Sequence, residues 1–152
     1  MNIQFTDNTK EAIEAKNEAV KKALYAVGMH LEGEAKEELE NTPRRVDTGL
    51  LRNSITFALS GEAPQIKSYH GDNPSRHNQV EAVPIGRYSG TATNDPVNER
   101  AVYIGTNVQY APYVHEGVQQ RMEPNRFLRN AVERNQAQVK DYIERELKKA
   151  QI

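Results

Sequence analysis

Apolar residues recur along the first third of the chain at the spacing of one helix face. Between Lys10 and Glu40 they step mostly by three or four residues, which predicts a long amphipathic α-helix. The stripe comprises Ile13, Val20, Leu24, Val27, Leu31, Ala35 and Leu39. Such a helix of about 30 residues is roughly 45 Å long. Gly28 and Gly33 each cost it about 1 kcal/mol relative to alanine, so we expect a bend or a close contact there.

The pattern changes after Pro43, which ends the predicted helix. From Ser54 to Leu59 apolar and polar residues alternate, and a period of two predicts a half-buried strand. A second strand is predicted over residues 101–105, and a short helical turn over residues 110–117. A second long helix is predicted from Pro124 to about Ala150. Its apolar stripe comprises Phe127, Leu128, Ala131, Val132, Val139, Tyr142, Ile143 and Leu147.

The stretch from Gly61 to Glu99 contains turn signals and few apolar residues. Residues 66–69 and 80–85 are candidate short strands, and we interpret the whole stretch, 61–99, as a long polar hairpin or flap. The chain, residues 1–152, is therefore predicted to be one α+β domain. Its long N-terminal and C-terminal helices pack on one face of a small antiparallel sheet.

Composition narrows the possible functions. The 152 residues fit one domain, and 37% hydrophobic against 27% charged residues makes the chain polar, so we expect extensive solvation or ordering by partners. A formal net charge of −1 gives no global attraction to nucleic acid or membranes, and the absence of cysteine excludes disulfides and thiolate metal sites. With no long apolar run and no signal-peptide pattern, we expect a protein made in a cytoplasm, or released from one by lysis.

Charged residues gather in two groups. The acidic group near the end of the first helix, interpreted as a solvated face or a contact with basic residues, comprises Glu32, Glu34, Glu37, Glu38 and Glu40. The basic group comprises Arg44, Arg45, Arg52, Arg121, Arg126, Arg129 and Arg134. We expect these arginines to pair with the acidic face, within or between subunits. The alternative is a positive lining that meets phosphates without reading sequence.

The decapeptide from Val46 to Ile55 lies between the helical and the alternating pattern. Asp47 can cap backbone N–H groups, and Gly49 can adopt a positive φ, so the stretch suits a structural corner. Asp-Thr-Gly is also the catalytic triplet of aspartic proteases, which need that carboxylate at the tip of a buried strand, facing its twin. Polar and basic residues 42–45 precede it and Leu50 follows it, which favours the corner. No serine or histidine has a recognised catalytic or ligand spacing, so no cofactor or metal is predicted.

Two separated blocks resemble the signatures of the minor tail, or tail-completion, proteins of long-tailed double-stranded DNA phages. The first is Thr42-Pro43 followed by residues 46–55, Val-Asp-Thr-Gly-Leu-Leu-Arg-Asn-Ser-Ile. The second is residues 110–117, Tyr-Ala-Pro-Tyr-Val-His-Glu-Gly, followed by residues 124–131, Pro-Asn-Arg-Phe-Leu-Arg-Asn-Ala. The departures from that pattern are the arginine pair at 44–45, His115, and Arg126 in place of a proline.

The resemblance implies a non-enzymatic structural subunit of the virion neck or tail, present in the host cytoplasm during assembly. Such a subunit joins copies of itself in a ring, expected to be a hexamer, which completes the tail and couples it to the head connector. Its partners would be a head connector or stopper protein and a tail terminator or tube protein. Genomic DNA would pass through the lumen without its sequence being read, and no membrane is involved. A dimeric aspartic protease and a sequence-independent nucleic-acid binder remain the alternatives.

The candidate site is a structural corner and subunit interface formed by the two blocks. It comprises Asp47, Thr48, Gly49, Leu51, Arg52, Ser54, Tyr110, Tyr113, Val114, Glu116, Gly117, Phe127 and Leu128. We expect Asp47 to cap the corner turn and Arg52 to hold an ion pair or a backbone carbonyl. The aromatic and apolar members of the second block are expected to pack the corner against the last helix; these are Tyr110, Tyr113, Phe127 and Leu128.

Overall fold

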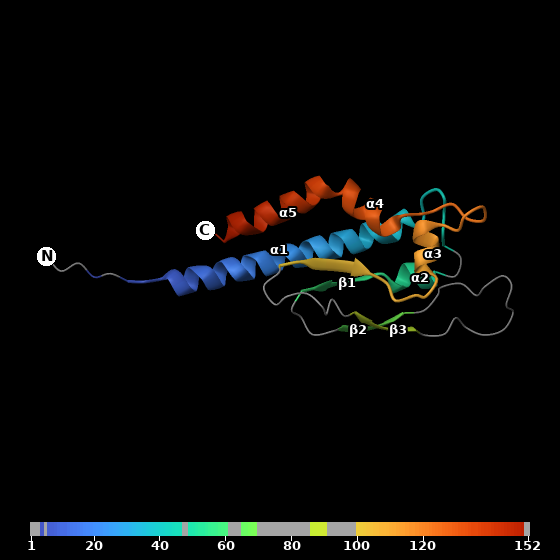
Figure 1. Cartoon of the computed structure of the whole chain (residues 1–152). Helices are drawn as coiled ribbons and strands as arrows, with labels where there is room; N and C mark the ends of the chain where they lie inside the picture. Colours follow the sequence, from blue (N-terminus) through green and yellow to red (C-terminus); the bar gives the residue numbers. More distant parts are fainter. Residues whose placement is uncertain are drawn as a thin grey trace.

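The computed structural model describes residues 4, 6–46, 49–60 and 100–150, together with the backbone of residues 65–69 and 86–90. It has long helices N-terminal and C-terminal to a small antiparallel sheet, which confirms the predicted α+β class (Figure 1). In chain order the elements are α1 (Thr9–Glu38), α2 (Leu50–Ser54), β1 (Thr56–Leu59), β2 (Gln65–Tyr69), β3 (Gly86–Gly90), β4 (Val102–Gly105), α3 (Ala111–Glu116), α4 (Phe127–Arg134) and α5 (Gln136–Lys149).

Helix α1 forms the middle layer of the molecule. The sheet of β1 and β4 packs on one side of it, and α4 and α5 pack on the other (Figure 1). The C-terminal helices therefore contact α1 and lie with it on the same side of the sheet. Helix α1 serves two neighbours because it buries more than the narrow stripe predicted; its buried residues are Ala19, Ala23, Val27, Gly28, Leu31, Ala35 and Glu38.

Strands β1 and β4 pair antiparallel, with Phe57 opposite Ile104. The alternation in β1 turns Phe57 toward α1, where its ring lies against Gly28. A Cβ atom added at Gly28 would stand 2.3 Å from Phe57 Cδ2, so glycine is required for this close approach. Among the described residues, no atom lies within 4 Å of a Cβ built at Gly33, so the close contact expected there is not formed by this part of the chain.

The flap contains a second antiparallel pair, in which β2 runs beside β3 from Gln65↔Gly90 to Tyr69↔Gly86. This agrees with the predicted hairpin and with the strand expected at residues 66–69. The strand expected at residues 80–85 falls outside the described residues, and the described partner strand lies directly after it. The two pairs form separate two-stranded sheets.

The last helix is not continuous, which corrects the prediction of one helix from Pro124 to Ala150. It is broken at Asn135, whose φ of −111° and ψ of 16° are not helical. The buried Asn135 amide donates from Nδ2 to the Ala131 carbonyl at 2.8 Å and to Glu34 Oε2 at 3.2 Å. Because this side chain competes with the backbone for hydrogen bonds, it interrupts the helical ladder between α4 and α5.

The N-terminal part of α1, residues 9–18, projects beyond the end of α5 (Figure 1). All ten of these residues are exposed, including Ile13 at 54%. Among the residues that the structure describes, no helix is long and apolar enough to cross a membrane.

Candidate functional site

The two sequence blocks meet at the end of α1, where α2, α3 and the start of α4 pack together (Figure 1). They share one apolar core, in which Leu39, Ile55 and Phe127 are completely buried. The other buried members are Ala35, Leu51, Val108, Ala111, Val114 and Ala131, and Leu128 packs against them partly buried. Phe127 and Leu128 therefore pack at the corner as predicted, and Leu51 and Val114 of the candidate site lie in the same core.

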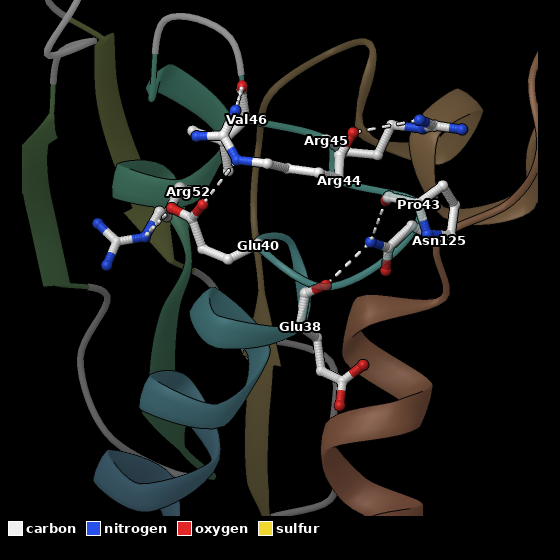
Figure 2. Close-up of polar contacts among 8 residues, drawn as sticks. All are labelled: Glu38, Glu40, Pro43, Arg44, Arg45, Val46, Arg52 and Asn125. Carbon is white, nitrogen blue, oxygen red and sulfur yellow. Dashed lines mark hydrogen bonds and ion pairs between the residues drawn. The ribbon is translucent and has the colours of Figure 1, made fainter.

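Asn125 ties the second block to the first. Its Nδ2 donates to the carbonyl oxygens of Glu38 at 2.9 Å and Pro43 at 3.0 Å, as Figure 2 shows. Its backbone N–H donates to the Val114 carbonyl at 2.9 Å. Asn125 is only 4% exposed, and its bonds satisfy one carbonyl at the end of α1 and one in the following turn. The sequence pattern indicated Asn125 only as a helix opener.

The three arginines of the first block are held by local acceptors (Figure 2). Arg44 Nε lies 3.0 Å from Glu40 Oε2, and Arg52 Nε lies 3.5 Å from Glu40 Oε1. Arg45 donates from Nη2 to the carbonyl of Glu123 at 2.8 Å, and Glu123 directly precedes residues 124–131, so this bond joins the same two regions of the chain. The ion pair expected of Arg52 is confirmed. Arg44, Arg52 and Glu40 are all more than a third exposed, so each pair contributes under about 1 kcal/mol and mainly orients the turn.

Glu38 departs from the expected solvated acidic face, because it is buried at 7% exposure. Its carboxylate pairs with Arg134 and accepts a hydrogen bond from Asn130 Nδ2 at 3.2 Å. The cause is position: Glu38 follows Leu31 and Ala35 on the stripe that faces α4. Pairing of the arginine group with the acidic face within one subunit is therefore confirmed at Glu38 and at Glu40.

Gly49 and Ser54 bound the short helix α2. Gly49 is buried and has a φ of 80°, the left-handed conformation that glycine adopts at little cost. The buried Ser54 hydroxyl donates to the Leu51 carbonyl at 2.7 Å and lies 2.5 Å from Thr106 Oγ1. It therefore joins the end of α2 to the segment after β4. Asp47 and Thr48 lie outside the described residues, so the capping role of Asp47 stays a prediction.

The two tyrosines of the second block do not pack into the corner, contrary to expectation. Tyr110 is 42% exposed and Tyr113 is 62% exposed. Helix α3 has only six residues, and its inward face is taken by Ala111 and Val114, which leaves the tyrosines on the outer side. Gly117 ends this helix with a φ of 77°, and a Cβ there would stand 2.7 Å from the Met122 carbonyl oxygen.

Glu116 and His115 form a small polar cluster beside the start of α4. His115 Nδ1 lies 2.7 Å from Glu116 Oε1, and Arg126 Nε lies 3.8 Å from Glu116 Oε2. The hydrogen bond from His115 and the nearby arginine charges lower the pKa of Glu116, which keeps this carboxylate ionised. The His115 ring packs edge-on against Phe127 with a centroid distance of 5.3 Å, so the cluster also covers the core.

The corner's polar groups thus bind one another across two distant blocks, and its apolar groups form one core. Within the described parts of the chain, no group of three or more His, Asp or Glu side chains is placed to hold a metal ion. A comparison of the chain with protein-family models, with curated proteins and with solved structures found no match.

Proposed function

We propose that the protein is a structural component of the head–tail junction of a long-tailed double-stranded DNA phage. Copies of the chain form a ring that completes the tail and couples it to the head connector or stopper protein on one side. On the other side the ring meets the tail terminator or tube protein. The genome passes through its lumen without sequence-specific contacts.

One observation carries this proposal: the two sequence blocks that resemble tail-completion proteins fold against each other. Residues 56–109 separate the two blocks in the chain, yet Asn125 of the second block bonds to the Pro43 carbonyl of the first. Beside these blocks, Arg45 bonds to the carbonyl of Glu123, which directly precedes residues 124–131. Leu51 and Ile55 share their core with Phe127 and Ala131. If the two blocks matched the family signature by chance, nothing would require them to pack against each other. If they are the signature of one fold, such packing is expected.

The surface of the isolated chain also suits a subunit of a larger assembly. Large apolar side chains are uncovered over several elements; they are Ile13, Tyr25, Met29, Tyr103, Tyr110, Tyr113 and Val132. Neighbouring copies in a closed ring cover such side chains on both faces of each subunit.

The proposal is tested by deleting the coding sequence in the phage or prophage genome that carries it. Electron microscopy of the lysate should show DNA-filled heads and complete tails that are not joined, with loss of infectivity. Adding the purified protein to that lysate should restore joined, infectious particles, and an equal amount of heat-denatured protein should not. Joined and infectious particles in the deletion lysate would refute the proposal.

A second experiment separates this function from an aspartic protease. Asp47→Asn removes the acid that a protease of that class requires, but an asparagine oxygen still caps a turn. We therefore expect Asp47→Asn particles to be joined and infectious. Unprocessed virion proteins and unjoined particles in this variant would instead favour the protease.

A further inference from the structure

We propose that residues 9–18 of α1, here called the arm, pack into an apolar groove on a second copy of this chain. The inference rests on the self-assembly part of the proposed function and names the surfaces that make the contact. Two exposed surfaces of one chain support it: the projecting arm and an apolar groove.

The groove lies between α1, β4 and the C-terminal helices and has a volume of about 570 Å³. Its walls are formed by apolar side chains, chiefly Leu31, Ile104, Leu128, Val132, Val139 and Ile143. Val132 is 44% exposed, and no residue of α5 is buried. The groove is therefore an open apolar surface, and such surfaces mark contacts with a partner.

The arm carries the matching apolar side chain. Ile13 lies on the same helix stripe as Val27 and Leu31, which are 14 and 18 residues further on and line the groove. At 100° per residue these positions differ by less than a quarter turn, so the stripe that is covered inside the body continues uncovered along the arm. The arm is about 15 Å long and has no buried residue, so packing on a partner would stabilise it.

Charges favour a second copy as the occupant. Lys10 and Lys16 flank Ile13 three residues to either side, on the same face of the arm. The groove is edged by Glu144, which is 49% exposed and only 3.8 Å from Lys140 Nζ in a weak surface pair. When Ile13 enters the groove, Lys10 or Lys16 of the arm can pair with the Glu144 carboxylate in place of Lys140.

The geometry has a consequence for assembly. Each copy offers one arm and one groove, so the contact is heterologous, and repeating it generates a ring if the rotation closes. This matches the ring of the proposed function and assigns the arm to the contact between neighbouring subunits.

The first test compares two substitutions that add the same charge to the arm. Ile13→Glu places a carboxylate on the stripe, whereas Ala15→Glu places it about 200° away on the opposite face. Self-association of the full chain, measured by sedimentation over a concentration series, should weaken about 10- to 100-fold in Ile13→Glu. It should change by no more than about twofold in Ala15→Glu. Equal effects of the two substitutions, or a wild-type chain that stays monomeric at every concentration, would overturn the inference.

Disulfide cross-linking tests the contact directly, because the natural chain contains no cysteine. A tagged Ile13→Cys copy mixed with an untagged Val132→Cys copy should give a cross-linked heterodimer on mild oxidation. The control replaces Val132→Cys with Gln119→Cys, which is exposed on the loop after α3 and away from the groove. A yield no higher than this control, from a sample that is oligomeric, would overturn the inference.

Restoration of joined particles by the arm variants separates the arm contact from the head–tail function. If Ile13→Glu protein restores joining to the deletion lysate as well as Ala15→Glu does, the arm contact is wrong and the head–tail function stands. If cross-linking succeeds while deletion particles are joined and infectious, the arm contact stands and the head–tail function is wrong.

Discussion

The two parts of α1 share one apolar periodicity but have different surroundings. Residues 19–38 lie between the sheet and the C-terminal helices, and seven of them are buried, whereas all of residues 9–18 are exposed. Ile13 and Leu31 occupy equivalent positions on the stripe, yet they are 54% and 4% exposed. Periodicity therefore indicates which face of a helix is apolar, but the length of the neighbouring elements decides how much of that face is covered.

The difference also explains how an exposed arm can remain helical. Starting a helix is unfavourable, whereas extending one costs little. The packed part fixes the first turns by burial, and the arm continues from it as an extension of the same hydrogen-bond ladder. In an isolated chain the arm should thus contribute little to global stability.

The largest expected effect contrasts two truncations on the stripe. Leu31→Ala should lower the free energy of unfolding by about 2 to 4 kcal/mol, because Leu31 is only 4% exposed and the change removes buried methyl groups. Ile13→Ala should change it by less than about 0.5 kcal/mol, because Ile13 is already hydrated. Urea unfolding of both variants, at a concentration where the chain is monomeric, measures the difference. Similar losses would mean that the arm is packed within the monomer.

A smaller effect separates the two glycines of the packed part. Gly28→Ala should destabilise the chain by about 1 to 2 kcal/mol, because the clash of the added Cβ with the Phe57 ring outweighs the gain in helix propensity. The Cβ added in Gly33→Ala lies more than 4 Å from the atoms of the described residues around it, so this change should stabilise the chain by up to about 1 kcal/mol. Thermal unfolding of both variants measures whether each is less or more stable than the natural chain.

A double variant tests the cause of the Gly28 effect. Adding Phe57→Leu to Gly28→Ala should recover part of the loss, because the smaller side chain can move away from the new methyl group. If the two losses simply add, the ring contact is not what makes glycine necessary at this position.

The sequence was informative where a local pattern determines local structure. The stripe from Ile13 to Leu39 predicted α1, and the alternation up to Leu59 predicted β1, with shifts of a few residues at the ends. The pairing of Arg52 with an acidic residue also followed from charge and position. In each case the residues that decide the structure are neighbours in the chain.

The features that the sequence did not predict depend on residues that pack against an element. Asn135 breaks the last helix because Glu34 and the Ala131 carbonyl are within reach of its amide, and Glu38 is buried because Arg134 and Asn130 meet it. Both are polar residues on apolar stripes, a signal that sequence reading could have used. The outward position of Tyr113 had no such signal, because a six-residue helix gives too little periodicity to orient it.

The smallest expected effect is at the start of the arm. Hydrogen bonds from the Thr9 hydroxyl and backbone amide lower the pKa of Asp7 below its usual value of 3.8, and the Asp7 Oδ1–Thr9 N distance is 2.9 Å. The pKa of Asp7 is lower in the folded chain than in the unfolded chain. The stabilisation that ionised Asp7 gives the first turn of α1 is therefore complete above pH 3.8 and is lost as the pH falls through the folded pKa. Asp7 is fully exposed, so the loss should fray only the first turn of α1, as seen in amide chemical shifts and hydrogen exchange of residues 9–12. In Asp7→Asn this acid-induced fraying should be smaller, since the amide does not titrate and only Glu11 remains as an acid in the first turn. If acid affects the first turn of both proteins equally, Asp7 does not support the arm, and its helicity depends on extension from the packed part alone.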